Sequence, residues 1–271
     1  MNAFTAILLG IVQGLTEFLP VSSSGHLLLM QNIFGVSEGG SFFTVLLHLG
    51  TLAAVLVVYR KRIIELVLHP LANKLYWLWI ISATLVTVVM ALALDRLGVL
   101  DAADTGRALG SCFLLTAALL TLSDLMRRHY SCEMTVESMR WYHALFIGFV
   151  QGIAPLPGVS RSGATIAAAS VCRMKREDAA EFSFLLSIPA ILGGAVLKIP
   201  PALREGLGGG MGALECLLGV AAAAISGYFA VRFMIRLITR RSFTGFAVYT
   251  AALGAFVLLD QHLLHWINWG L

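Results

Sequence analysis

The chain has 271 residues, of which 58% are hydrophobic and only 13% are charged, and its mean hydropathy is +0.85. Soluble domains carry about 25% charged residues, so this composition excludes a soluble protein and indicates an integral membrane protein. The net charge of +4 comes from short basic clusters beside apolar segments, as membrane topology and anionic headgroups require, so we expect membrane lipids and no nucleic acid as partners.

Apolar segments follow one another without a long polar segment between them, which predicts a single membrane domain over residues 1–271. The first segment, residues 3–35, is interrupted near its middle by Pro20 and Gly25 with serines between them. Each half has about 10 to 17 residues, whereas crossing a bilayer takes about 20. We therefore expect a re-entrant helix pair that enters the membrane and returns to the same side.

Three uninterrupted apolar segments follow, at residues 42–59, 76–95 and 108–126. A second interrupted segment, residues 141–173, repeats the pattern of the first. It is followed by three more predicted spans, at residues 179–199, 213–235 and 243–264. We expect the glycine-rich stretch at 206–210 to be an outer loop, and Trp266 and Trp269 to belong to an outer aromatic belt.

The lysine and arginine positions orient this arrangement. With the N-terminus outside and both interrupted segments folded as hairpins, the inner side carries fourteen of the nineteen basic residues and the outer side four. Arg161 alone lies at a hairpin tip. Because inner loops carry the excess of lysine and arginine, we expect both termini outside.

The two interrupted segments have similar sequences. GIVQGLTEFLPVSSSGH begins at Gly10 and GFVQGIAPLPGVSRSGA at Gly148, an offset of 138. Each half is thus a hairpin followed by three spans, and an odd number of crossings inserts the second half upside down. We therefore predict an all-α membrane protein with an inverted-topology repeat, six transmembrane helices and two re-entrant hairpins, ten helices in all. The repeats cover about residues 1–130 and 138–271.

The two hairpin tips are expected to meet inside the membrane. Irregular backbone at that depth is tolerated only within protein or beside a watered cavity. A helix restarts near Ser24 and near Ser162, so two helix N-termini converge with the guanidinium of Arg161, an arrangement that favours an anion. A charge placed there is costly, so a functional role is the default for Arg161. The glycines that allow close backbone approach are Gly25, Gly158 and Gly163.

The polar residues around the tips contain what phosphoryl transfer needs: a carboxylate, an imidazole, hydroxyls and an anion clamp. They are Gln13, Glu17, Ser22, Ser23, Ser24, His26, Ser160, Arg161, Ser162 and Thr165. Gln13 and Glu17 are four residues apart on one helix face, so their oxygens and substrate phosphates suit a divalent cation, Mg²⁺ or Ca²⁺. The alternative for Glu17 is a buried carboxyl that only pairs with Arg161.

With these residues the chain resembles the undecaprenyl-diphosphatase family, also known as the bacitracin-resistance protein family. QGLTE at 13–17 fits its (E/Q)xxxE motif, and VSSSGH at 21–26 fits the segment that ends in its essential histidine. PGVSRSGAT at 157–165 fits its PGxSRSxxT motif, and EFSFLLSIP at 181–189 is also similar. Many members have Glu where this chain has Gln13, which leaves one carboxylate fewer.

The resemblance implies a phosphatase that removes the terminal phosphate of undecaprenyl diphosphate at the outer face of the bacterial inner membrane. Such an enzyme regenerates the lipid carrier of peptidoglycan synthesis and confers bacitracin resistance. The resemblance also implies dependence on a divalent metal. The residues to which it assigns roles are Glu17, Ser23, His26, Ser160, Arg161 and Thr165.

The expected mechanism places Ser23 as the nucleophile and His26 as the residue that moves the proton, with direct attack by water as the alternative. Glu17 is expected to orient His26 or, with Gln13, to hold the cation. His48 either faces the cavity or packs against a neighbouring helix. Beside Arg161, the residues expected to bind the phosphate are Ser22, Ser24, Gly25, Ser160, Ser162, Gly163 and Thr165.

The principal alternative function is a transporter or flippase of a lipid phosphate or a small anion, because inverted repeats with broken helices are common in transporters. A pure transporter has little use for His26 and Glu17 beside clustered serines, whereas a phosphatase needs them. The small residues at 221–227 pack either within the chain or between the protomers of a homodimer.

Overall fold

The computed structural model describes residues 2–34, 40–204, 212–267 and 269. Within these ranges every regular element is helical, and strand pairing is limited to one isolated bridge between Met134 and Met174. The predicted all-α fold is therefore confirmed for the described part of the chain. The glycine-rich stretch at 206–210 lies outside the described residues.

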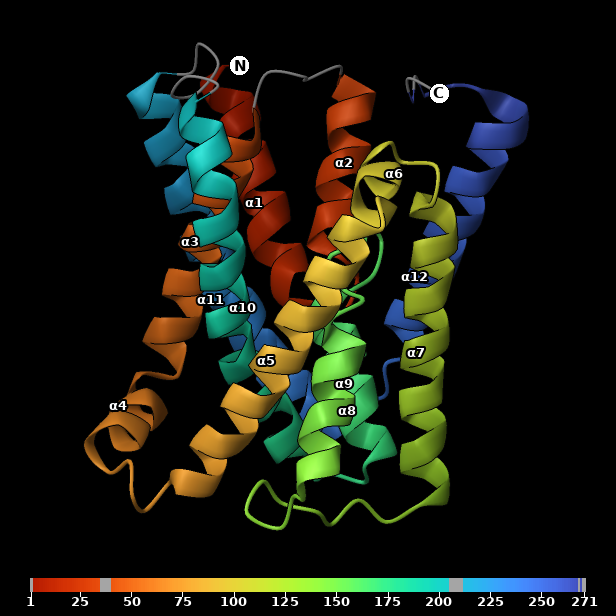
Figure 1. Ribbon diagram of the computed structural model, residues 1–271. Coiled ribbons are helices and arrows are strands. Elements are labelled where there is room, and N and C mark those ends of the chain that lie inside the picture. Colours follow the sequence, from red (N-terminus) through yellow and green to blue (C-terminus); the bar gives the residue numbers. More distant parts are fainter. Residues whose placement is uncertain (1, 35–39, 205–211, 268, 270–271) are drawn as a thin grey trace.

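The described helices form one bundle (Figure 1). In chain order they are α1 (Ala3–Phe18), α2 (Ser23–Phe34), α3 (Gly40–Val58), α4 (Arg60–Leu68), α5 (Lys74–Arg96), α6 (Val99–Asp104), α7 (Leu109–His129), α8 (Trp141–Gln151), α9 (Arg161–Val171), α10 (Arg176–Arg204), α11 (Ala213–Arg240), α12 (Thr244–Leu259) and the π-helix η2 (Asp260–Leu264). The beginning of α1 and the end of α12 lie at the same end of the bundle (Figure 1).

Five of the described helices are long and apolar enough to cross a membrane: α5, α7, α10, α11 and α12 with η2. A sixth crossing results if α3 and α4, which meet at 75°, form one bent span. All six lie on segments predicted as spans, so the chain is a multi-pass membrane protein.

Two short helices, α4 and α6, are absent from the prediction of ten helices. The first predicted span, residues 42–59, is followed by Arg60, Lys61 and Arg62 at the start of α4, and the chain bends by 75° between α3 and α4. Three consecutive cations are costly in an apolar layer, which disfavours a straight continuation of α3. The six-residue α6 begins after Gly98, whose φ of 68° favours glycine.

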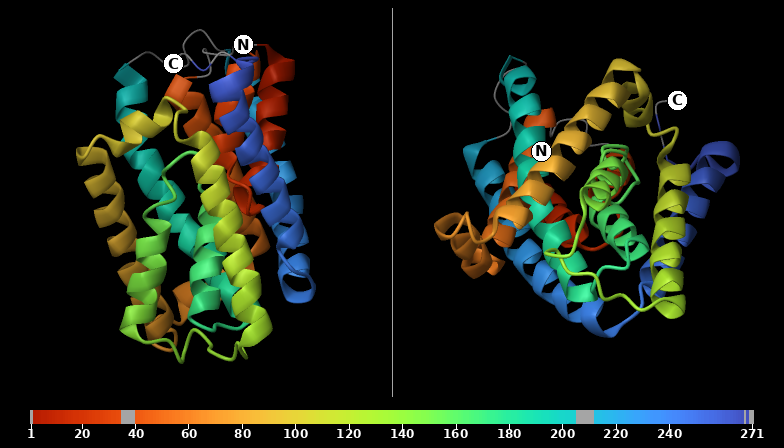
Figure 2. Two further views of the ribbon diagram at one scale, coloured as in Figure 1. Left: turned by 90° about the vertical axis from the view of Figure 1, so that its right-hand side faces the viewer. Right: turned by 60° about the horizontal axis from the view of Figure 1, so that its bottom comes forward.

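Neither interrupted segment forms a spanning helix. The first folds as α1 and α2, of 16 and 12 residues, and the second as α8 and α9, of 11 residues each. In Figure 1, α1 and α2 occupy the upper half of the bundle and α8 and α9 the lower half, so each pair returns toward the end where it began. Figure 2 shows α8 and α9 enclosed by the longer helices.

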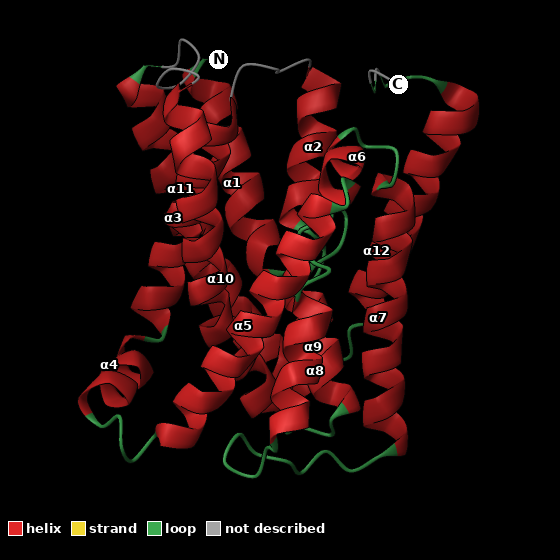
Figure 3. Cartoon of the chain, in the orientation of Figure 1, coloured by secondary structure: helices red, strands yellow, loops and turns green. Residues whose placement is uncertain are grey.

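Proline and glycine separate the two helices of each pair. Leu19, the C-cap of α1, has extended backbone with ψ of 141°, as expected for a residue before Pro20. After α8 the chain passes Pro157 to Gly158, whose φ of 97° favours glycine. Figure 3 shows the loops that follow α1 and α8 at mid-height in the bundle. We call these loops the first tip, residues 19–22, and the second tip, residues 152–160.

In each short pair, a glycine packs closely against a long helix of the other half of the chain. A Cβ added to Gly10 of α1 would lie 3.0 Å from the Cβ of Ala222 in α11. Gly148 of α8 holds the equivalent place in the repeat, and a Cβ there would lie 2.8 Å from the Cα of Ala83 in α5. The small residues at 221–227 therefore contact α1 within the chain, one of the two predicted alternatives.

The two tryptophans expected in an aromatic belt differ in environment. Trp266 is 74% exposed, but Trp269 is only 8% exposed, and its Nε1 donates a hydrogen bond to Asp260 Oδ2 at 2.8 Å. Asp260 is fully buried and also accepts the backbone N–H of Trp266. The expectation for Trp269 is wrong because a buried carboxylate, which needs donors, binds its indole N–H.

Candidate functional site

The two tips touch each other at the centre of the bundle, as the repeat predicts. Ser22 Oγ accepts the backbone N–H of Gly158 at 3.1 Å, and Ser162 Oγ donates to the carbonyl of Leu19 at 3.3 Å. A Cβ added to Gly25 would lie 2.9 Å from the backbone of Gly158. Glycine is therefore required at position 25, where the backbone at the start of α2 approaches the second tip.

The two helices that follow the tips are capped in the same way. Ser22 Oγ accepts the N–H of Gly25 at 3.3 Å, and Ser160 Oγ accepts the N–H of Gly163 at 3.1 Å. The helices begin at Ser23 and Arg161, each within one residue of the restart expected near Ser24 and near Ser162. Each cap leaves the other N–H groups of its first helical turn at the junction of the tips.

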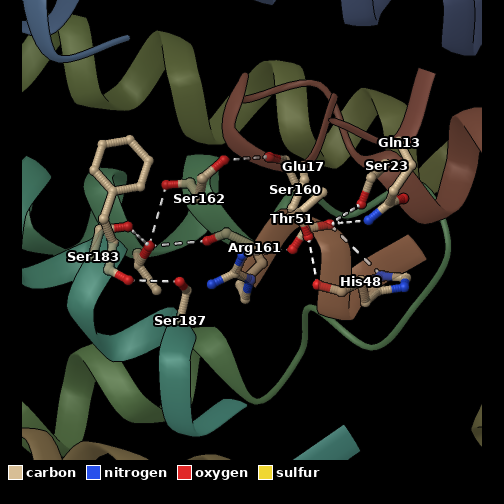
Figure 4. A network of polar contacts seen from close by, with 12 residues as sticks. Gln13, Glu17, Ser23, His48, Thr51, Ser160, Arg161, Ser162, Ser183 and Ser187 are labelled. Carbon is tan, nitrogen blue, oxygen red and sulfur yellow. Dashed lines mark hydrogen bonds and ion pairs between the residues drawn. The ribbon is translucent and has the colours of Figure 1, made fainter. Parts of the chain in front are cut away.

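Glu17 is the centre of the polar network at this junction (Figure 4). Its Oε1 accepts a hydrogen bond from Arg161 Nη2 at 2.7 Å, and the two form an ion pair. Its Oε2 accepts from Ser23 Oγ at 2.5 Å and from Gln13 Nε2 at 2.9 Å. Because Glu17 is only 6% exposed, these donors replace the water that the buried carboxylate has lost.

His48 also reaches this network, which decides between its two predicted positions. Its Nε2 lies 3.7 Å from Glu17 Oε2, and its Nδ1 lies 2.7 Å from the carbonyl of Thr44. The buried hydroxyl of Thr51 donates to the His48 carbonyl at 2.7 Å and so fixes this turn of α3. The imidazole therefore adds a third nitrogen-bearing group, after Arg161 and Gln13, to the surroundings of Glu17 (Figure 4).

His26 makes different contacts, and the first of the two roles expected for Glu17, orienting His26, has no hydrogen bond to support it. His26 Nδ1 lies 2.7 Å from the carbonyl of Ser22, and Nε2 lies 2.7 Å from the hydroxyl of Tyr249 in α12. Both ring nitrogens are thus engaged away from Glu17. Tyr249 was not predicted from the sequence, because a tyrosine inside an apolar segment matches no motif.

The expected phosphate-binding residues divide by exposure. Ser24, like Ser23 and Arg161, retains partial exposure. Ser22, Gly25, Ser160, Ser162, Gly163 and Thr165 are buried. Thr165 Oγ1 lies 2.5 Å from Ser183 Oγ of α10 and donates to the carbonyl of Arg161 at 3.0 Å. The buried residues therefore join the tips and neighbouring helices. The partly exposed residues, Ser23, Ser24 and Arg161, are available to a bound group.

The donor set for a divalent cation is small. Gln13 Oε1 is buried without a hydrogen-bond partner, next to the carboxylate of Glu17. Among the described residues there is no group of three or more His, Cys, Asp or Glu side chains suited to a metal. One carboxylate and one amide oxygen fit Mg²⁺ or Ca²⁺ only if substrate phosphates and water supply the remaining ligands, as is usual for Mg²⁺.

A buried carboxylate joined to a serine hydroxyl and a guanidinium, between broken helices of a multi-pass bundle, defines a membrane protein with a candidate site for an anionic group. The sequence matches the family described as bacitracin resistance protein BacA over residues 6–256. The chain belongs to this family.

Named relatives cover nearly the whole chain. It is 41% identical over 266 residues to the undecaprenyl-diphosphatase of Carboxydothermus hydrogenoformans, covering 96% of this chain and 98% of the relative. It is 38% identical over 261 residues to undecaprenyl-diphosphatase 3 of Bacillus cereus, with the same coverage of both chains. The undecaprenyl-diphosphatase of Alkaliphilus metalliredigens is 38% identical over 276 residues.

Proposed function

We propose that this protein is an integral membrane phosphatase that hydrolyses undecaprenyl diphosphate to undecaprenyl phosphate and inorganic phosphate. This activity recycles the lipid carrier of peptidoglycan synthesis and accounts for bacitracin resistance. The observation that carries the proposal is the contact of Ser23 and Arg161 with the two oxygens of Glu17. A nucleophile, a proton acceptor and an anion clamp are thereby combined in one member of the family.

The proposed topology is an inverted repeat in the bacterial inner membrane, with α1–α2 entering from the outer side and α8–α9 from the inner side. The equivalent packing of Gly10 against α11 and of Gly148 against α5 supports this topology. Both termini lie outside, and the site opens to the outer side, where the diphosphate enters. The prenyl tail remains in lipid between helices, since burying it in the polar junction would gain nothing.

Substrate binding uses the groups that are already cationic or donate hydrogen bonds. Arg161 is 16% exposed at its side chain and moves from Glu17 to the terminal phosphate, which it binds through two N–H groups. The N–H groups at the start of α2 and α9 and the hydroxyl of Ser24 complete the cradle. They stabilise the charge that develops on the phosphoryl oxygens.

In the proposed reaction Ser23 Oγ forms a bond to the terminal phosphorus, and the bond from that phosphorus to the bridging oxygen breaks. Undecaprenyl phosphate leaves. Glu17 accepts the serine proton, because the Ser23 hydroxyl is bonded to Glu17 and not to His26. Water then cleaves the phosphoserine and releases inorganic phosphate, and Glu17 returns the proton to Ser23. Direct attack by a water molecule bonded to Glu17 is the alternative route.

Glu17 and Gln13 would hold a divalent cation, Mg²⁺ or Ca²⁺, together with the substrate's phosphate oxygens. The cation would supply additional positive charge to the diphosphate. Arg161 binds the terminal phosphate, and Glu17 accepts the proton of Ser23.

Purified protein in detergent tests the function directly. We expect phosphate release from undecaprenyl diphosphate, lower release with chelator, and loss of release in Arg161→Ala. The broken helices also suit a transporter of lipid phosphate. Movement of labelled lipid across vesicles without any phosphate release would support that function and reject the phosphatase.

A further inference from the structure

His26 is held between the first tip and α12. Its Nε2 lies 2.7 Å from the hydroxyl of Tyr249, and the two rings are stacked, with centroids 5.7 Å apart and planes 16° apart. Phe113 of α7 packs edge-on against the imidazole, with centroids 5.5 Å apart. His26 is 9% exposed, whereas Tyr249 is 46% exposed. Tyr249 therefore lies between the buried imidazole of His26 and the surface of the bundle.

The contacts of His26 fix its tautomer. The carbonyl of Ser22, 2.7 Å from Nδ1, can only accept a hydrogen bond, so Nδ1 must carry the proton. Nε2 of the neutral ring then has a lone pair, and the hydroxyl of Tyr249 donates to it. Tyr249 thereby stabilises the tautomer in which His26 binds Ser22.

Ser22 needs this support because its backbone is strained. Its φ of 71° is in the left-handed region, which is unfavourable for a residue other than glycine. Its carbonyl accepts both the backbone N–H of His26, at 3.2 Å, and Nδ1–H. Its hydroxyl accepts the N–H groups of Gly25 and Gly158. Strain at a site is maintained only where surrounding contacts over-determine the conformation.

Ser23 follows Ser22 directly, so the conformation of Ser22 sets the direction of the Ser23 hydroxyl toward Glu17. We propose that Tyr249 is a positioning residue for the phosphatase reaction: through His26 it holds Ser22 in its left-handed conformation and thereby aims Ser23 at Glu17. This inference rests on the proposed function. It assigns a role to a residue of α12 that reaches Ser23 only through His26 and Ser22.

The test compares Tyr249→Phe with Tyr142→Phe in the full chain in detergent. Tyr142 is a matched control because it is 43% exposed and lies at the start of α8. Loss of one hydrogen bond is worth about 1 kcal/mol, so we expect kcat of Tyr249→Phe to fall about five- to tenfold. KM should stay unchanged, since Tyr249 does not touch the substrate. The control should keep the kcat of wild type.

A spectroscopic measurement separates this inference from the function itself. In protein labelled with ¹⁵N-histidine, the resonance lost in His26→Asn identifies His26. We expect the Nδ1–H tautomer in wild type and a shifted Nε2 resonance in Tyr249→Phe. The ¹⁵N spectrum of His26 can be measured even if the wild type releases no phosphate. Absence of phosphate release would reject the proposed function but not the contact of Tyr249 with His26. An Nε2–H tautomer in wild type, or equal kcat in the two tyrosine variants, would overturn the inference.

Discussion

Ser23 and Arg161 stand at equivalent positions of the two halves of the chain, and each donates a hydrogen bond to one oxygen of Glu17. Each is the first residue of its helix, α2 or α9, directly after a capping serine. The donor–acceptor distances are 2.5 Å for Ser23 and 2.7 Å for Arg161. Equivalent positions of the repeated sequence thus bring two helix starts, with different donor groups, to one carboxylate.

Replacing Arg161 should remove activity even where charge is kept. We expect kcat to fall about a hundredfold or more in Arg161→Ala, and Arg161→Lys to fail similarly, because an ammonium cannot bind two phosphate oxygens as a planar fork. Phosphate release at saturating substrate measures this effect. A near-normal rate in Arg161→Lys would contradict the clamp.

Stability must be separated from this effect. Arg161→Ala leaves the buried carboxylate of Glu17 without its cation, which costs about 3–5 kcal/mol in buried pairs. The double variant Arg161→Ala with Glu17→Gln removes that unpaired charge. We therefore expect its thermal midpoint in detergent to recover toward wild type while its phosphate release stays abolished.

Ser23 and Ser24 provide a matched pair for the nucleophile. Both are partly exposed on the first turn of α2, but Ser23 is bonded to Glu17 whereas Ser24 Oγ lies 3.4 Å from Ser22 Oγ. We expect Ser23→Ala to lose at least about a thousandfold in kcat, as loss of a nucleophile does. Ser24→Ala, which loses one phosphate hydrogen bond, should fall about tenfold.

Acid quenching during turnover of substrate labelled on its terminal phosphate measures the covalent intermediate. The label should be recovered on Ser23 by peptide mapping. Activity of Ser23→Ala comparable to that of Ser24→Ala, with no labelled peptide in wild type, would establish the water route instead.

Much of the fold follows from sequence because apolar length and repetition are strong signals in membranes. Five of the six predicted spans lie on helices that are long and apolar enough to cross, the sixth lies on the bent pair α3 and α4, and Pro20 marks a true interruption. The bend after α3 was not predicted, because the direction of the chain at the cations that follow residues 42–59 depends on packing.

The contacts inside the site were less predictable. The direction of side chains at a helix start depends on the backbone of the residue before it, and the positive φ of Ser22 carries no glycine signal. His26 therefore could not be assigned to Tyr249, which is 223 residues away along the chain. By contrast, Arg161 and Glu17 were predictable as partners because buried charges require compensation.

Gly25 should not tolerate a side chain. A Cβ there would lie 2.9 Å from the backbone of Gly158 and 2.7 Å from Phe113 Cζ, so Gly25→Ala must separate the two tips. We expect a loss of about 1–3 kcal/mol in stability together with loss of phosphate release, measured by thermal unfolding and by the release assay.

Gly194→Ala is the control, since a Cβ at Gly194 in α10 meets no atom within 4 Å. A helical glycine replaced by alanine should gain up to about 1 kcal/mol, so the midpoint of this variant should stay the same or rise. Equal midpoints and rates in the two variants would show that the tips need no close approach.

Gln13→Glu should make the protein depend more strongly on a divalent cation. The new carboxylate would face Glu17 across the distance that Gln13 Nε2 now spans by a 2.9 Å hydrogen bond, and two like charges there repel unless a cation lies between them. We therefore expect a lower thermal midpoint than wild type in chelator and a larger rise on adding Mg²⁺ or Ca²⁺. The half-activating cation concentration for phosphate release should fall as well. Gln13→Ala is the control, because it removes the amide without adding charge. If the midpoint of Gln13→Glu responded to cation no more than that of Gln13→Ala, this pair of positions would not be a cation site.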